Sequence, residues 1–279
     1  MGLLKQPGTE DREPPSALVG TKYLPSLNNA VWEKDERIKD VNFHDQVEIE
    51  KNLQLAIRRA RLSVEILKRP SENNTKYDLF QRLNAGGTPA NPQELRNCVI
   101  IMVSNEYYQF VKDVANSQDF LAVLAASDEQ KERQRHMEYA SRFLVLSHIP
   151  YDNKLDVEEF IDEGIIALAE RGEIERHRAI FVRTFALLNR AFGGDAFRRY
   201  TNGQHSGRVS LAAFECIAVG LGKNIDTVSK KDDPVSFIRE RIKLFWADES
   251  LKEFFTPGLR GTTRIQRTIP FGLNWFKDE

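Results

Sequence analysis

Apolar residues recur with a helical period over most of the chain after residue 104. Six stretches place them on one stripe near a 3.6-residue repeat, and the pair Gly193–Gly194 ends one of them as a C-terminal cap. We therefore expect a helical bundle over residues 104–279. The six stretches are 105–127, 128–149, 155–172, 173–194, 208–224 and 233–248.

The first hundred residues follow a different pattern. Residues 17–32 mix β-branched and aromatic residues with Gly and Pro, which is typical of short extended segments and turns. Residues 44–60 repeat apolar positions with a roughly helical period, and residues 62–67 alternate apolar and polar positions as a half-covered strand does. Strands and helices in this part, followed by the bundle, predict an α+β protein.

Residues 74–98 form the most patterned segment of the chain. A first helix is expected to stop at Gly86–Gly87, because glycine adopts the left-handed backbone of a helix end without steric cost. Asn91 before Pro92, with Glu94 three residues after the cap, predicts that a second helix begins with a capping box. The segment thus predicts two helices joined by a tight glycine turn.

Two interpretations of this turn are open. In the first, the glycines serve the turn alone, and Arg82, Asn84 and Arg96 are structural or surface polar groups. In the second, Arg82 and Asn84 lie beside the backbone N–H groups of Gly86 and Gly87 and bind an anion. Guanidinium groups and free backbone donors both favour phosphate oxygens.

At these residues the sequence resembles a known family. The block reads F-x-R-x-N-x-G-G, five further residues, then Q-E-x-R-N, and is similar to the signature of the GmrSD restriction-endonuclease N-terminal domain family. The resemblance is specific within the first hundred residues and looser beyond them. The matching positions are Phe80, Arg82, Asn84, Gly86, Gly87, Gln93, Glu94, Arg96 and Asn97.

The resemblance implies a partial ParB/sulfiredoxin-like α/β domain over residues 1–103, in a protein of prokaryotic defence against foreign or modified DNA. It also implies nucleotide binding, with a nucleoside triphosphate and Mg²⁺ as the expected cofactor. The residues expected to contact the nucleotide are Arg82, Asn84, Gly86, Gly87, Glu94, Arg96 and Asn97.

The catalytic motif of that family, Asp-Gly-Gln-Gln-Arg, does not occur among the 279 residues. In the family this motif precedes a helix whose end resembles the opening residues MGLLKQPG, so we expect it to fall before residue 1. The chain then resembles a shortened family member whose fold a second chain could complete, and its catalytic residues stay unidentified. The family's nuclease is a separate domain or subunit, and no His-Asn-His nuclease core is visible in this sequence.

The C-terminus interleaves arginines with threonines and glycines and ends in aromatic residues. Guanidinium and hydroxyl donors of this kind favour contacts with a nucleic-acid backbone, which makes Arg260, Arg264 and Arg267 candidate DNA ligands. The alternative is that Trp275 and Phe276 dock this tail onto the bundle.

Composition narrows these hypotheses only slightly. The formal net charge of -1 gives no global field that would attract DNA, so a nucleic-acid contact must come from a local patch. Cys98 and Cys216 stand in apolar surroundings, which fits buried thiols in a reducing compartment rather than a disulfide framework. No apolar run approaches the roughly 20 residues of a membrane helix, and the N-terminus lacks the apolar core of a signal peptide. We therefore expect a cytoplasmic protein without a membrane partner.

Other motifs fail on their spacing. Residues 220–224 lack the first glycine and the final hydroxyl of a P-loop, and residues 152–159 lack the glycine of a calcium loop. The five histidines stand singly, without metal-ligand spacing, and His148 in LSHIP lacks the partners of a nuclease site. Helical packing is therefore the expected role of His148.

Two function classes stay open. One is a nucleotide-binding, NTP-hydrolysing component of a restriction or phage-defence system. The other is a non-catalytic module that binds DNA or a partner such as a separate nuclease subunit. Nucleotide turnover would support the first, and salt-dependent DNA binding without nucleotide would support the second. A degraded gene product without activity is a third alternative.

Overall fold

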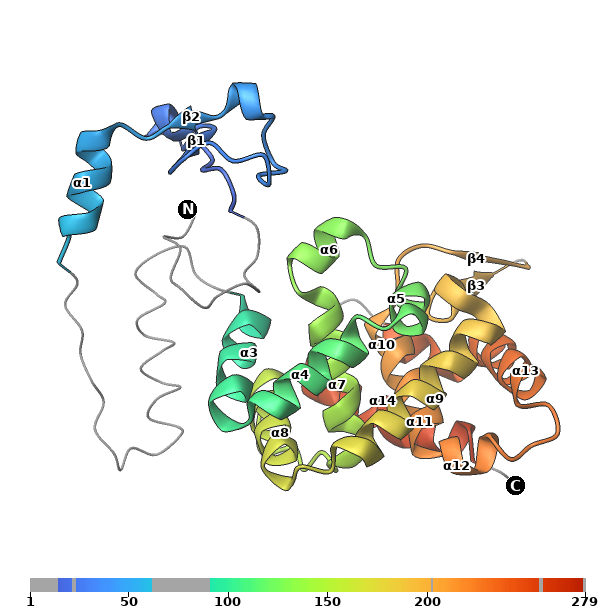
Figure 1. Ribbon diagram of the computed structural model, residues 1–279. Helices are drawn as coiled ribbons and strands as arrows, with labels where there is room; N and C mark the ends of the chain where they lie inside the picture. The colour runs from blue at the N-terminus through green and yellow to red at the C-terminus, as the bar shows by residue number, and fades with distance from the viewer. Residues whose placement is uncertain (1–14, 22–23, 62–90, 202, 256–257, 278–279) are drawn as a thin grey trace. The chain divides into compact units, whose positions relative to one another are not determined.

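The chain forms two compact units, Met1–Pro70 and Ser71–Glu279, which are described separately. Helices dominate the part of the chain that the structure describes, and its strands are few and short, in agreement with a helix-rich α+β class (Figure 1). Among the described helices none is long and apolar enough to cross a membrane. The computed structural model describes residues 15–21, 24–61, 91–201, 203–255 and 258–277.

The described part of the first unit is built on one parallel strand pair. Strand β1 (Ala30–Val31) pairs with β2 (Val47–Glu48), after the short helix η1 (Pro25–Leu27). The buried amide of Gln46 fixes the connecting loop, because it both donates to the Asp35 carbonyl and accepts from the Asp35 N–H at 3.0 Å. Short extended pieces and turns were predicted for residues 17–32, and that prediction is confirmed.

The helix predicted over residues 44–60 is only partly present. Helix α1 occupies Lys51–Arg59, whereas residues 43–45 form the short helix η2 (Phe43–Asp45) and Val47 lies in β2. The Val47 N–H donates to the Asn29 carbonyl at 3.0 Å, so pairing with a distant segment holds this residue extended. The strand predicted over 62–67 lies outside the described residues.

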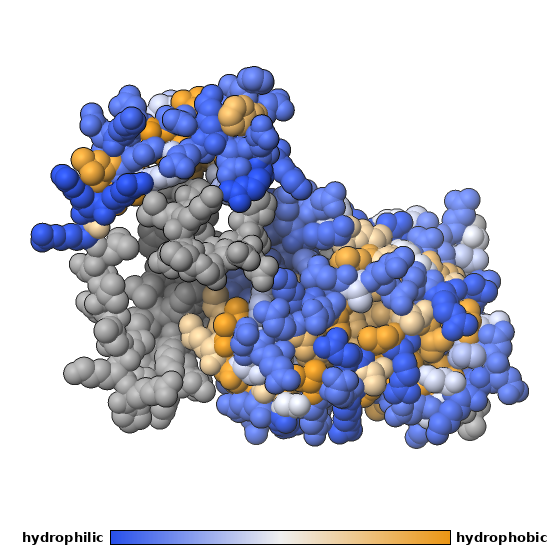
Figure 2. Space-filling view, in the orientation of Figure 1, coloured by the Kyte–Doolittle hydropathy of each residue, from blue (hydrophilic) through white to orange (hydrophobic). Residues whose placement is uncertain are grey.

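The second unit is a helical bundle with an aromatic core. The rings of Phe120, Phe143, Phe181 and Phe185 contact one another with centroid separations of 4.6 to 5.2 Å, although they come from three different helices. Hydrophilic side chains cover most of the described surface in view, with apolar residues in small groups between them (Figure 2). The helices are α3 (Pro92–Val103), α4 (Asn105–Ala115), α5 (Gln118–Leu124), α6 (Asp128–Glu132), α7 (Arg135–His148), α8 (Val157–Arg171), α9 (Ile174–Phe192), α10 (Leu211–Phe214), α11 (Gly220–Lys223), α12 (Ile225–Val228), α13 (Pro234–Ala247) and α14 (Gly261–Trp275), with the π-helical turn η4 (Glu215–Val219) and the short helices η3 (Gly193–Asp195) and η5 (Glu249–Phe255).

Two of the predicted helices are broken by local turns. The stretch 105–127 divides into α4 and α5 at Ser117, whose hydroxyl donates to the Val114 carbonyl at 2.8 Å. The stretch 128–149 divides into α6 and α7 at Gln134, which has a left-handed backbone with φ of 59°. The apolar stripe continues through both breaks, so its period does not reveal them. The stretches 155–172, 173–194 and 233–248 are helices as predicted, in α8, α9 and α13.

The C-terminal stretch was not among the six predicted helices, but most of it is helix α14. Gly272 in this helix lies against the backbone of Cys216 so closely that no Cβ would fit between them. Phe276 is fully buried, and Trp275 Nε1 donates to the Arg241 carbonyl at 3.0 Å. Docking of this stretch by Trp275 and Phe276 is therefore confirmed, which by itself does not test DNA contact by the arginines. A hairpin of β3 (Arg199–Thr201) and β4 (Gln204–Ser206), which periodicity did not predict, precedes α10.

Candidate functional site

The signature block falls partly within the described residues. Arg82, Asn84, Gly86 and Gly87, the residues predicted to hold the anion, lie outside them. The structure describes the block from Asn91 onward, where helix α3 begins. The second half of the block, Gln93 to Asn97, therefore lies in helix α3.

Asn91 and Glu94 form the predicted capping box. Asn91 Oδ1 accepts from the backbone N–H groups of Gln93 and Glu94, each at 3.0 Å, and Glu94 Oε2 accepts from the Asn91 N–H at 2.8 Å. These bonds satisfy N–H groups that the first turn of a helix leaves without partners. In this structure the Glu94 carboxylate therefore holds the start of its own helix.

Arg96 is one of the most deeply buried side chains of the second unit, with 1% of its side chain exposed. Its Nε donates to Asp162 Oδ1 at 2.6 Å, and its Nη2 donates to Glu158 Oε2 at 3.0 Å. Its Nη1 donates to Gln93 Oε1 at 2.6 Å, while Gln93 Nε2 donates to Asn97 Oδ1 at 2.7 Å. The structural interpretation of Arg96 thus has direct support, since two carboxylates of α8 neutralise its charge.

These contacts tie α3 to the helical unit. Helix α3 packs against α4 and α8, and the chain divides between residues 70 and 71. The predicted boundary between residues 103 and 104 differs from this division, because a sequence pattern does not show which unit covers the buried face of a helix.

A chain of alternating charges continues from Arg96 through the bundle. Glu158 accepts from Arg142 Nη2 at 2.9 Å, and Arg142 Nη1 lies 3.6 Å from Glu215 Oε1. Arg264 closes the chain, because its Nε and Nη2 donate to the two carboxylate oxygens of Glu215 at 2.9 and 3.1 Å. Burial raises the pKa of Glu158, but Arg142 and Arg96 outweigh burial and leave that pKa below its usual value. Residues from four helices and the π-helical turn therefore share one internal ion-pair chain.

Glu215 links Arg142 to Arg264 in this ion-pair chain. Its side chain is completely buried, and Thr268 Oγ1 adds a hydrogen bond at 3.1 Å to the two from Arg264. It opens the π-helical turn η4, a rare geometry that is often found at functional sites. Here the turn places Glu215 between Arg142 and Arg264. The ion-pair chain therefore connects Arg96 of the signature block with Arg264 of the C-terminal arginines.

The three predicted DNA-binding arginines divide accordingly. Arg264 faces inward onto Glu215, with 19% of its side chain exposed. Arg260 and Arg267 lie on the surface at the start and middle of α14. The structure therefore leaves two of the three at the surface.

No protein-family model, curated protein or solved structure matches the chain. The resemblance to the GmrSD N-terminal domain family rests on its signature residues. Gln93, Glu94, Arg96 and Asn97 are the members of that signature that the structure describes. All four fix helix α3.

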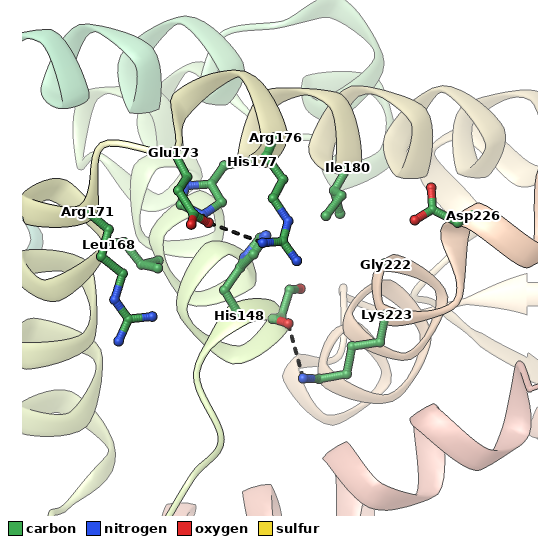
Figure 3. Close-up of a pocket in the computed structure, with 11 residues that line it drawn as sticks. His148, Leu168, Arg171, Glu173, Arg176, His177, Ile180, Gly222, Lys223 and Asp226 are labelled. Carbon is green, nitrogen blue, oxygen red and sulfur yellow. Dashed lines mark hydrogen bonds and ion pairs between the residues drawn. The ribbon is translucent and has the colours of Figure 1, made fainter.

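A polar pocket that the sequence patterns did not indicate lies elsewhere in the second unit (Figure 3). Its volume is about 330 Å³, and it forms where the ends of α7 and α8 meet the start of α9 and helix α11. Its charged lining consists of Arg171, Glu173, Arg176, Lys223 and Asp226. The histidines that line it, His148 and His177, come from different helices, so no spacing rule links them.

The two histidine rings contact each other, with centroids 4.2 Å apart. His148 Nδ1 lies 2.7 Å from the Leu144 carbonyl, which only accepts, so Nδ1 carries the hydrogen and Nε2 is an acceptor. That Nε2 atom is buried and has no hydrogen-bond partner among the described residues. Burial, followed by the nearby His148, lowers the pKa of His177 to about 4, and burial lowers the pKa of His148 as well. Both rings are therefore neutral at pH 7.

Proposed function

We propose that the protein is a nucleotide-binding component of a prokaryotic DNA-restriction or phage-defence system. The nine signature residues, which occur in the family's order along the sequence, support this proposal. The contacts that hold the second half of the signature in helix α3 support it as well. Glu94, Arg96 and Asn97 anchor helix α3 through a capping box and a buried ion pair. The segment that contains Arg82 and Asn84 is followed in the sequence by a helix start that these contacts hold in place, and a preorganised binding site needs support of this kind.

In this proposal the phosphate contacts come from Arg82, Asn84 and the backbone of Gly86 and Gly87. Glu94, Arg96 and Asn97 position them without touching the nucleotide, a different role from the direct contact that the signature implied. Within the described ranges no group of three metal-binding side chains is arranged to hold a metal ion. Mg²⁺ would arrive with the triphosphate, whose oxygens supply most of its ligands, as is common for this ion. Hydrolysis would require residues beyond this signature.

The decisive experiment is nucleotide binding to the full chain by isothermal titration calorimetry, with ATP and GTP in the presence of Mg²⁺. Arg82→Ala should weaken binding by about 1.5 to 3 kcal/mol, the usual worth of a hydrogen bond to a charged group, and leave thermal stability unchanged. Arg61→Ala removes an exposed arginine outside the signature and is the matched control. Arg96→Ala should instead unfold or strongly destabilise the protein, because it removes a buried guanidinium group that bonds two carboxylates of α8.

Either of two results would contradict this proposal. One is the absence of binding for either nucleotide to the wild-type chain. The other is an equal loss of stability in Arg82→Ala and Arg96→Ala, which would make Arg82 a structural residue.

A second candidate function is a non-catalytic module that binds DNA or a separate nuclease subunit. The surface positions of Arg260 and Arg267 on α14 favour it. Replacing both by Ala should then reduce DNA affinity and flatten its dependence on salt, since each phosphate contact releases counterions. Unchanged salt dependence in the double variant would exclude α14 as the DNA-binding surface.

A further inference from the structure

We infer that the pocket between α7, α8, α9 and α11 binds a phosphate group, either free or carried by a small molecule. This inference does not rest on the proposed function, because the pocket contains no residue of the signature block. Two features of the pocket support it, an excess of positive charge and buried polar groups without a hydrogen-bond partner among the described residues.

The positive charge of the pocket exceeds what its carboxylates neutralise. Asp226 Oδ1 accepts from Nη2 of Arg183, which does not line the pocket, at 2.6 Å. Glu173 contacts Arg176 at 3.3 Å. The side chain of Lys223 and that of Arg171 have no carboxylate partner among the described residues, so at least one anionic charge would be stabilised here.

Lys223 is the residue whose positive charge an anion would stabilise most. Its Nζ donates to the Ser147 carbonyl at 3.1 Å (Figure 3), and burial lowers the pKa of its ammonium group. An ammonium carries three donors, and a carbonyl occupies only one of them. A phosphate oxygen placed beside Nζ would take a second donor and compensate for the charge that burial disfavours.

The neutral groups of the pocket also suit a phosphate. His148 Nε2 and the Ser147 hydroxyl are buried and without a hydrogen-bond partner among the described residues. A monoprotonated phosphate offers both an O–H donor and several acceptor oxygens, so it can satisfy groups of both kinds. A volume of about 330 Å³ is at the lower end of the usual range for small-molecule sites, which fits phosphate or a small phosphomonoester.

No short sequence motif indicates this pocket, and the positions of its residues explain why. Lys223 belongs to the stretch 220–224, where a P-loop was rejected, and Gly220–Lys223 is indeed helical. The lysine reaches the pocket from the end of α11 and not from a glycine-rich loop. Phosphate recognition here would rest on side chains of four helices, for which no short motif exists.

The test follows the histidine signals of the full chain by NMR during titration with inorganic phosphate, in parallel with calorimetry at low ionic strength. Phosphate should move the His148 and His177 signals and leave the His44 and His205 signals in place. Lys223→Gln should weaken phosphate binding by about tenfold or more, because the amide can keep the bond to Ser147 but carries no charge. Lys112→Gln, which removes an exposed lysine away from the pocket, should bind phosphate as the wild type does.

Further arms separate the sources of the phosphate and the two sites. AMP that binds more tightly than inorganic phosphate identifies a nucleotide as the source, whereas equal or weaker AMP binding identifies free phosphate. Asp226→Asn should tighten binding several-fold, since it removes a negative charge from the rim. Arg82→Ala should leave the shifts of His148 and His177 intact, so a failure of the nucleotide proposal would not be mistaken for a failure here. The inference is overturned if phosphate and AMP both leave these two signals unmoved, or if Lys223→Gln and Lys112→Gln weaken binding equally.

Discussion

Replacing Glu215 by Gln tests the internal ion-pair chain at its most buried member. The substitution keeps the size and shape of the side chain and removes its charge. Glu215 accepts two hydrogen bonds from Arg264 and one from Thr268, and it lies 3.6 Å from Arg142. After substitution, the guanidinium groups of Arg142 and Arg264 face a neutral amide whose NH₂ group is itself a donor.

The expected cost is large. Removing one partner of a buried ion pair commonly destabilises a protein by about 3 to 5 kcal/mol, because the remaining charge stays buried without compensation. Only 3% of the Arg142 side chain and 19% of the Arg264 side chain are exposed, so water would compensate poorly for the lost carboxylate charge. For a unit of this size each kcal/mol lowers Tm by about 2 to 4 °C. We therefore expect Tm to fall by roughly 8 to 16 °C, taking about 4 kcal/mol as the central loss.

The assay is urea unfolding followed by far-ultraviolet circular dichroism, which reports on the helices of the second unit. Asp226→Asn is the matched control, since Asp226 and Arg183 are separated by only 2.6 Å but their side chains are 75% and 42% exposed. An exposed pair of this kind is worth about 0 to 1 kcal/mol. If Glu215→Gln costs no more than Asp226→Asn, the buried chain of charges does not stabilise the fold and the reasoning fails.

Two further predictions concern packing and acid stability. Gly220→Ala should destabilise the protein by about 3 kcal/mol, because its Cβ would meet the backbone of Gly272. Gly207→Ala, where φ is 82° and the space is open, should cost only about 1 to 2 kcal/mol in the same urea assay, and a reversed order would contradict the close helix contact. His177 has a folded-state pKa of about 4, below its unfolded value, so its contribution is complete above pH 6.5 and is lost as pH falls from 6.5 to 4. The loss should reach about 3 kcal/mol, and a His177→Gln variant with the same pH dependence as the wild type would refute this assignment.

Local chemistry made parts of the structure predictable. The start of α3 follows from Asn91, Pro92 and Glu94 alone, because a capping box uses only atoms within one helical turn. Docking through Trp275 and Phe276 was also among the alternatives, since a buried terminus needs apolar anchors. Both features depend on residues whose preferences act close to their own position in the sequence.

Contacts between distant residues were not predictable. Arg96 and Asp162 are 66 residues apart in the sequence, and Arg264 and Glu215 are 49 residues apart. A pattern within one segment therefore cannot indicate that these residues pair. Helix α14 contains glycines, threonines and Pro270, which disfavour helix formation in isolation. Packing of Gly272 against the backbone near Cys216 overrides that preference.

The separation of Glu215 from its partners has a consequence for the chain during synthesis. A ribosome reaches Arg264 only after adding 49 residues beyond Glu215, and Thr268 after 53. At about 5 to 20 residues per second this interval lasts roughly 2.5 to 10 seconds. Throughout it the Glu215 carboxylate and Gly220 have no α14 to pack against, so the nascent helical unit remains open on this side. The side of the second unit that α14 covers is therefore the last part of it to form during synthesis.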